Sequence, residues 1–219
     1  MINQEYIAFF NELANNNNKE WFDLHRSEYE KEVRKPFIEL VESLIPGVME
    51  LEPTILPDAK KSLFRINRDI RFSKDKTPYN LMMKSGLSPG GKKSELPGFY
   101  LGIGADYVHI GGGLYQLSSS ALKNVRLLIA GHTDEFLSII ESSSFKKYFG
   151  ELQGEQNKRI GPDFQAVITK TPYILNKQFY AMAKLPTSEF INESNQAGRL
   201  LEYYSAIQPL HSFLNKAFG

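Results

Sequence analysis

The order of the hydrophobic patterns along the chain constrains its fold more than any other feature of the sequence. Apolar residues recur at helical spacing from Tyr6 to Leu44, alternate in short runs near the middle, and return to helical spacing from Leu200 onward. Helices gathered on both sides of a block of strands are typical of an α+β fold, because an α/β fold alternates the two. The sequence predicts an N-terminal helical layer on a central antiparallel or mixed sheet, with further helices at the C-terminal end.

Length and composition predict that residues 1–219 form a single domain. A chain of 219 residues is long enough for one well-buried core and short for two full domains, and no linker or repeat interrupts it.

Three helices are expected in the N-terminal part. The first would begin at Asn3 as N-cap, and its inward face would carry Tyr6, Phe9, Phe10 and Leu13. A capping box of Asn17 and Glu20 predicts the start of the second helix, whose inward residues would be Trp21, Phe22, Tyr29 and Val33. Pro36 fits the first turn of a third helix, which Pro46-Gly47 is expected to end.

Strands are expected in the middle of the chain, with helices after them. Residues 81–87 read as a strand, and residues 99–110 read as a hairpin that turns at 104–106 and ends at the three glycines 111–113. Further elements are a helix from Ser118, a helix at about 133–140, a strand at 178–185, and a helix at 197–218 kinked at Pro209. Residues 142–177 are poorly periodic and predict no element.

One segment gathers most of the positive charge. Between Lys60 and Lys76 lie seven basic and two acidic residues, a local net charge of +5 in a chain whose total is +1. A nearly neutral chain that concentrates its positive charge in this way usually directs it at an anion or at its own carboxylates.

Two local conformations remain open for this basic segment. As an extended strand, it would place Phe64, Ile66, Ile70 and Phe72 on one face, with Arg68 among them. A guanidinium on an apolar face is costly unless it is paired. A turn at residues 67–69 would instead free Arg68 to join Arg65 and Arg71.

The preferred hypothesis is a site for an anionic ligand. Guanidinium groups suit bidentate contact with phosphate or carboxylate, and the predicted anion-binding residues are Arg65, Arg68, Arg71, Lys74 and Lys76. The three arginines would clamp the anion and the two lysines would steer it, either in a binding protein or in an enzyme acting on a small anionic metabolite. Four residues are predicted to support the site: Asp69 and Asp75 by orienting arginines, Tyr79, and Trp21 as a stacking platform beside the patch.

Two alternatives stand beside this hypothesis. The same patch on an open face would suit a nucleic-acid or protein interaction module, with nucleic acid as the second choice of partner. The cluster would otherwise be a structural ion-pair network.

Several classes of chemistry lack support in the sequence. There is no cysteine, so there is no disulfide, no thiolate nucleophile and no cysteine-ligated metal. The four histidines are scattered without metal-ligand spacing: His25, His109, His132 and His211. We expect no metal, no cofactor and no membrane segment, and no secretory signal is evident, so a cytoplasmic location is the default.

The basic segment also carries a family resemblance. The run from Arg65 to Asn80, RINRDIRFSKDKTPYN, resembles the hallmark of the bacterial and fungal family known as domain of unknown function 2461. Three other stretches fit the same pattern in the same order: NNNKEWFD, GFYLGI and GGGLY. Where the family pattern has a lysine after the Pro-Tyr pair, this chain has Asn80. The resemblance implies a single-domain α+β protein and brings no established activity.

Overall fold

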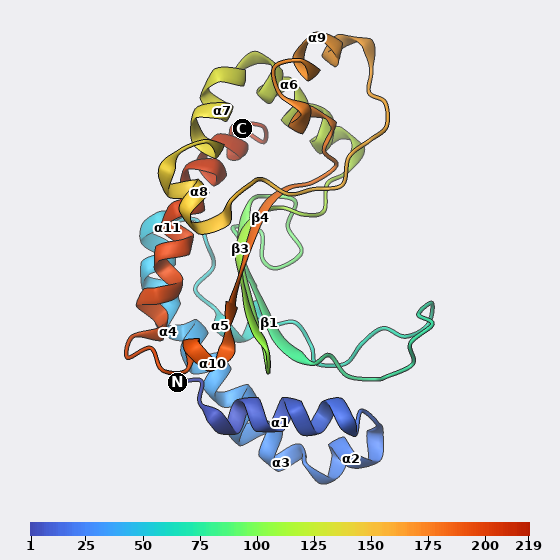
Figure 1. The fold of residues 1–219 in the computed structure, drawn as a ribbon, viewed down its shortest axis with the longest axis vertical. Coiled ribbons are helices and arrows are strands. Elements are labelled where there is room, and N and C mark those ends of the chain that lie inside the picture. The colour runs from blue at the N-terminus through green and yellow to red at the C-terminus, as the bar shows by residue number, and fades with distance from the viewer.

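The structure, a computed structural model that describes residues 1–219, has the expected α+β architecture. Four strands form one antiparallel sheet in the order β1-β2-β3-β4, with β1 at Met82–Leu87, β2 at Gly98–Gly104, β3 at Tyr107–Leu114 and β4 at Phe179–Pro186. Helices α4 and α11 cover one face of the sheet, and α1 to α3 lie at one end of it (Figure 1). The predicted strands and hairpin are confirmed.

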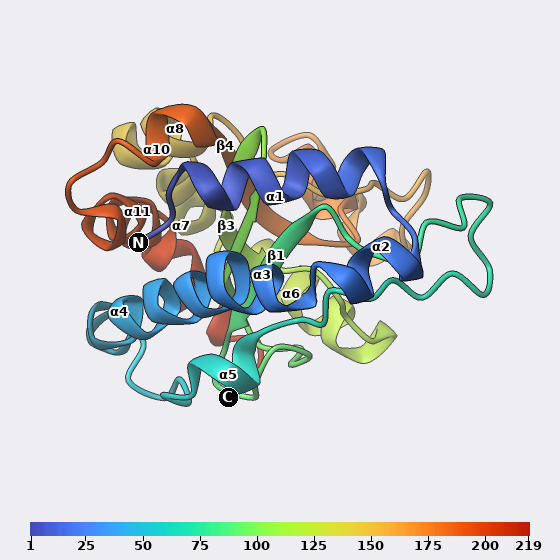
Figure 2. The same ribbon diagram turned by 90° about the horizontal axis from the view of Figure 1, so that it is seen from below.

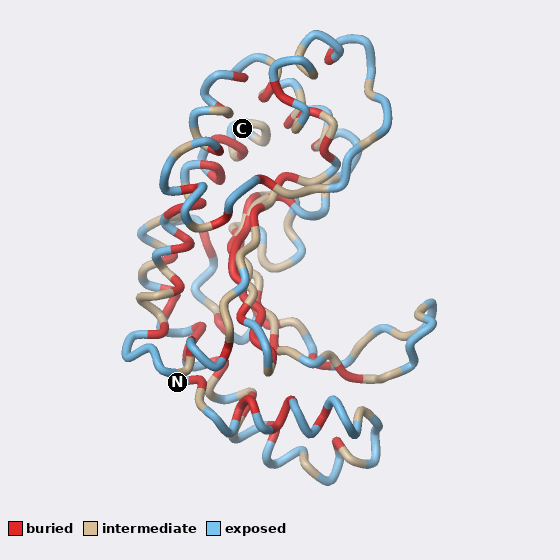
Figure 3. The backbone as a smooth tube through the Cα atoms, in the orientation of Figure 1, coloured by how far each residue is buried: buried red, intermediate tan, exposed pale blue.

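Alternation along the strands separates a core face from an open face. The core face carries residues that are buried beneath the helices: Met83, Ser85, Leu87, Phe99, Leu101, Ile103, Val108, Ile110, Leu114, Phe179 and Ala181. These residues belong to one hydrophobic cluster or line it, and the buried stretches follow the sheet and the helices that cover it (Figure 3). We use the term open face for the opposite side of the sheet.

The first helix begins as predicted, whereas the helices after it run on further than the sequence indicates. Helix α1 (Gln4–Asn15) is capped by Asn3, whose Oδ1 accepts a 3.2 Å hydrogen bond from the Tyr6 N–H. A nearly continuous helical run follows, and it lies beside α1 (Figure 2). This run consists of α2 (Lys19–Leu24), α3 (Arg26–Glu28), the π-helix η1 (Tyr29–Arg34) and α4 (Lys35–Leu51).

The predicted capping box at Asn17 is wrong. The N-cap of α2 is Asn18, whose Oδ1 accepts a 2.9 Å hydrogen bond from the Trp21 N–H. Asn17 instead bonds the backbone of Tyr79 twice: its Nδ2 donates to the Tyr79 carbonyl at 3.0 Å and its Oδ1 accepts from the Tyr79 N–H at 3.1 Å. A tertiary contact therefore takes the side chain that the local pattern assigned to a cap.

Of the two prolines in the third predicted helix, Pro36 lies where it was expected and Pro46 does not end the helix. Pro36 lies in the first turn of α4 but follows η1 without a break, and Pro46-Gly47 does not end the helix, which continues to Leu51. Tertiary packing explains why the helix continues past Pro46. A side chain at Gly47 would come within 2.6 Å of Leu201 Cδ1, so α4 and α11 (Gln196–Asn215) approach closely there, and their packing offsets the backbone bond that Pro46 cannot make.

The extended strand over residues 64–72 does not form. After the short helix α5 (Ala59–Ser62) the chain runs along the edge of β1, where Leu63 bridges Ser85 and Asn67 bridges Tyr79. Beyond Arg68, whose N–H donates to the Pro78 carbonyl, the chain projects away from the body as a loop (Figures 1 and 2). Phe72 in this loop is 96% exposed, so the alternating pattern of the sequence does not correspond to a buried face.

The C-terminal helices follow the sequence prediction. Helix α6 (Ser119–Gly131) is capped by Ser118, α7 spans Thr133–Ile140, and α11 contains Pro209 without ending there. The stretch that predicted no element holds α8 (Ser143–Phe149), η2 (Pro162–Phe164), α9 (Gln165–Ile168) and η3 (Pro172–Leu175), and α10 (Thr187–Phe190) follows β4. No helix combines the length and apolar character needed to cross a membrane.

The three glycines at 111–113 lie inside β3 rather than at its end. They pair with β2 on one side and β4 on the other. A Cβ at Gly112 would come within 2.8 Å of the buried ring of His211 from α11. Glycine is thus needed at position 112, where α11 approaches the strand, and at position 113, where φ is +121°.

Gln196 joins distant parts of the chain. Its Oε1 accepts a 2.9 Å hydrogen bond from the Ile2 N–H, and its Nε2 donates to the Ile2 carbonyl at 2.7 Å. Gln196 and Ile2 are both buried. The side chain therefore satisfies two buried backbone groups and ties the residues before α1 to the start of α11.

Candidate functional site

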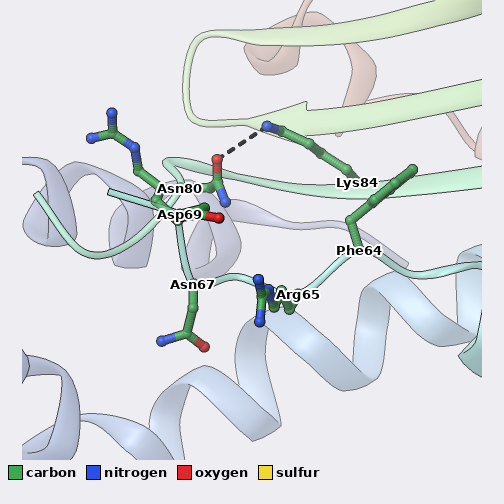
Figure 4. Close-up of a pocket in the computed structure, with 7 residues that line it drawn as sticks. Phe64, Arg65, Asn67, Asp69, Asn80 and Lys84 are labelled. Carbon is green, nitrogen blue, oxygen red and sulfur yellow. Dashed lines mark hydrogen bonds between the residues drawn. The ribbon is translucent and has the colours of Figure 1, made fainter. Parts of the chain in front are cut away.

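A pocket of about 350 Å³ lies at the β1 edge of the open face (Figure 4). We call it the edge pocket, and its lining is Phe64, Arg65, Asn67, Arg68, Asp69, Asn80 and Lys84. The Phe64 N–H donates to the Lys84 carbonyl at 2.9 Å and the Asn80 N–H donates to the Ile66 carbonyl at 2.8 Å. These bonds hold the basic segment against β1, so the fold creates the pocket from residues up to 20 positions apart.

Lys84 is a basic residue of this pocket that the sequence analysis did not single out. It points to the open face from the middle of β1, and its Nζ donates to Asn80 Oδ1 at 3.1 Å (Figure 4). Burial, and then the nearby Arg68, lower the pKa of Lys84. No carboxylate forms an ion pair with Lys84, so the protein does not neutralise the positive charge of this side chain.

Arg65 is exposed and has no ion pair or side-chain hydrogen bond within the protein. The guanidinium offers five donors that await an acceptor. Arg65 is thus the group that is most available to an external anion.

Arg68 is held by the loop that it helps to close. Its Nη1 donates to Asp75 Oδ2 at 2.5 Å, to the Thr77 carbonyl at 3.1 Å and to the Thr77 hydroxyl. Hydrogen bonds from Thr77, followed by the one from Arg68, lower the pKa of Asp75 to about 2. Asp75 is therefore ionised at neutral pH and orients Arg68, as the sequence analysis expected of this carboxylate.

Arg71 is likewise paired, but outside the pocket. Its Nε and Nη2 donate to the two carboxylate oxygens of Asp69 at 2.9 and 2.7 Å, and this contact lowers the pKa of Asp69. Lys76 donates to the Ile70 carbonyl at 2.9 Å, and Lys74 is exposed on the same loop. The structure brings Arg65 and Arg68 into the pocket and leaves Arg71, Lys74 and Lys76 on the projecting loop.

The two aromatic residues predicted to support the site lie elsewhere. Tyr79 is buried and stacks on Phe22 with ring centroids 4.0 Å apart. Trp21 stacks on His25, also at 4.0 Å, and packs against Phe9. Neither lines the edge pocket, although Tyr79 lines a second, larger pocket.

A larger pocket of about 690 Å³ lies on the other side of the same segment. It shares Phe64, Arg65 and Asn67 with the edge pocket. Its floor is apolar and includes Phe22, Leu63, Tyr79 and Met83, whereas its other basic residues are Arg26, Arg34, Lys60, Lys92 and Lys93. Glu30 is the acid in the lining and pairs with Arg34 at 3.0 Å.

The sequence could not reveal this second set of basic residues as a group. Lys92 and Lys93 come from the loop after β1, and Arg26 and Arg34 come from the helical run, so only tertiary structure places them beside Arg65. Lys92 contacts the basic segment directly, by donating to the Leu63 carbonyl. The two pockets together surround Arg65 with positive charge.

Comparison with known protein families agrees with the resemblance seen in the sequence. The model of the family described as "Conserved hypothetical protein (DUF2461)" matches residues 5–213. This match covers most of the chain, and the protein therefore belongs to that family. A search of curated proteins returned no match.

Proposed function

We propose that this protein binds a small phosphate-bearing ligand at Arg65, where the edge pocket and the larger pocket meet. The observation that carries the proposal is that Arg65 has no partner in the protein although it lines both pockets. Phosphate is preferred over carboxylate, because it accepts hydrogen bonds on several oxygens and matches the planar guanidinium.

The two pockets suggest how such a ligand would lie. Lys84 approaches the anion from the edge pocket, and Lys60 and Lys93 approach it from the larger pocket. The apolar floor of the larger pocket, which includes Tyr79 and Met83, suits a ring or short chain attached to the phosphate. The cysteine-free sequence suits a reducing cytoplasm, which is where we propose that the protein acts.

Thermal unfolding in phosphate tests the proposal. A ligand at ten times its Kd stabilises the folded state by about 1.4 kcal/mol, which raises Tm by about 3 to 6 °C in a protein of this size. The measurement compares potassium phosphate with potassium chloride at equal ionic strength, up to about 10 mM phosphate. Phenyl phosphate should bind at least about tenfold more tightly than inorganic phosphate, because its ring is removed from water on the apolar floor.

Two variants localise the effect. Arg65→Met should abolish the stabilisation while leaving the fold intact, because the side chain is exposed and unpaired. Lys74→Met removes a positive charge from the same segment outside both pockets and should keep most of the effect. Equal Tm values in phosphate and chloride, or equal losses in the two variants, would show that Arg65 is not a phosphate site.

A further inference from the structure

The open face of the sheet carries a row of basic side chains. Lys84 of β1, His109 of β3 and Lys184 of β4 are the basic residues of the four strands, which contain no acidic residue. The strand register aligns them across the sheet, since Lys84 pairs with Gly102, Gly102 with His109, and His109 with Lys184. Directly paired residues project from the same face, so the three side chains form one row on the side away from α4 and α11.

This row lacks a counter-charge. Lys184 is exposed and approaches only a ring, with its Nζ 5.7 Å from the Tyr107 centroid. Burial, and then the charges of Lys184 and Lys84, lower the pKa of His109. At the β1 edge the row continues into Arg65 and Arg68 of the edge pocket.

Tyrosine rings lie beside the same row. Tyr100 extends across Gly102, because a Cβ at Gly102 would come within 2.9 Å of the Tyr100 hydroxyl. Tyr115, directly after β3, is 64% exposed and meets Tyr180 edge to face at 5.3 Å between centroids. Tyr107 is 47% exposed. The open face therefore carries two exposed rings, Tyr107 and Tyr115, beside the partly buried rings of Tyr100 and Tyr180.

Glycine keeps these rings accessible. Six glycines alternate with core residues and so occupy the open face: Gly86, Gly98, Gly102, Gly104, Gly111 and Gly113. At Gly102 in particular, a larger residue would displace the Tyr100 ring, since a Cβ there would lie 2.9 Å from the Tyr100 hydroxyl. The middle of the open face therefore carries few side chains, and the tyrosine rings and the basic row lie around it.

We propose that the open face binds single-stranded nucleic acid, with phosphates along Arg65, Lys84 and Lys184 and bases stacked on Tyr100, Tyr115 and Tyr180. Three strand spacings of about 4.8 Å separate β1 from β4 by about 14 Å, so one phosphate cannot contact both lysines and a ligand with several phosphates is needed. Exposed aromatics on a four-stranded sheet are an efficient platform for unpaired bases. This surface shares Arg65 and Lys84 with the proposed phosphate site and otherwise lies beyond it.

Other polyanions match the face less well. A bare polyphosphate would meet the lysines but leave the tyrosine rings without a stacking partner. A duplex hides the faces of its bases, so it would use the charges and not the rings. The combination of rings and cations favours an unpaired strand.

Fluorescence anisotropy with labelled 12-residue oligo(dT) and oligo(U) tests the proposal. With the three permanent cations Arg65, Lys84 and Lys184 in contact, the slope of log affinity against log salt is about −2.1. Lys184→Met should weaken binding at 50 mM salt and reduce the slope by about 0.7, because one contact is lost. Tyr115→Ala should weaken binding about 5- to 150-fold and leave the slope unchanged, because it removes stacking. Lys35→Met, on α4 at the other side of the sheet, is the matched control and should bind as the wild type does.

The outcomes separate this proposal from the phosphate site. If inorganic phosphate raises Tm but neither oligonucleotide binds at tens of micromolar, the open face is not a nucleic-acid surface and the phosphate site stands. If a 12-base-pair duplex or polyphosphate competes as well as the single strand, and Tyr115→Ala has no effect, the stacking proposal is wrong. If the affinity for the single strand falls in both Lys184→Met and Tyr115→Ala, the nucleic-acid proposal is supported. This holds even if phosphate alone has no effect on Tm.

Discussion

Burial of His211 should make the stability of this protein sensitive to mild acid. The residue is 3% exposed, its Nε2 has no hydrogen-bond partner, and its ring packs against Phe99 with centroids 4.6 Å apart. Burial lowers the pKa of His211 to about 3. The folded protein therefore holds a neutral imidazole at pH values where the unfolded chain, with a pKa of about 6.5, binds a proton.

The size and sign of the effect follow from this difference in pKa. Because only the unfolded chain gains the proton, the free energy of unfolding falls as the pH decreases below about 6.5 and levels off near pH 3. Each pH unit in this window removes up to about 1.4 kcal/mol. Acidification from pH 7 to pH 5 should therefore cost about 2 kcal/mol through His211 alone.

Urea unfolding at pH 7, 6 and 5 measures this contribution. His211→Met replaces the imidazole by an unbranched side chain that adapts to irregular packing, so its loss of stability between pH 7 and pH 5 should be smaller than that of the wild type by about 2 kcal/mol. His132→Met, at an exposed histidine, should keep the wild-type dependence. All other titrating groups are common to the proteins compared, so equal pH dependences in wild type and His211→Met would refute the reasoning.

Two further predictions concern positions that the backbone contacts define. Asn17→Ala removes both hydrogen bonds to the Tyr79 backbone and should lower the free energy of unfolding by about 1 to 3 kcal/mol. Urea unfolding measures this, with Asn15→Ala at an exposed helix end as the control variant. Equal stabilities of the two variants would contradict the prediction. Gly111→Ala would place a Cβ 1.9 Å from the Ala181 carbonyl oxygen in β4 and should cost about 3 kcal/mol. Gly131→Ala, with open space around it, should leave Tm unchanged or raise it, and a similar Tm for both alanine variants would show that β4 yields freely.

Local signals in the sequence predicted the elements well where no distant contact competed with them. Asn3 caps α1 as expected, and α6 begins after Ser118 as expected, because the contact of Ser118 with Glu95 leaves its cap bond to Ala121 in place. The pattern misplaced the cap of α2, because the Asn17 side chain bonds the backbone of Tyr79, 62 positions away. Its neighbour Asn18 caps the helix instead. The alternation that ends at Phe72 likewise carried no information on burial, since the loop projects beyond the core.

The candidate site was predictable only in part. The cluster of charge pointed to Arg65 and Arg68, which lie on one short segment and line the edge pocket. Lys84 and Lys184 lie 100 positions apart in the sequence, and only the strand register places them in one row on the sheet. A usable signal was nevertheless present, because all four strands lack acidic residues while two of them carry a lysine.

The bond pair between Gln196 and Ile2 bears on the order of folding events. Closing a loop of 194 residues costs about 5 kcal/mol of chain entropy, whereas two hydrogen bonds return only about 1 to 3 kcal/mol. The hydrogen bonds between Gln196 and Ile2 therefore form only after packing of the surrounding core has brought the two residues together. During synthesis, Ile2 leaves the ribosome long before Gln196 does. The contact that ties the residues before α1 to α11 can therefore form only after α11 has been synthesised.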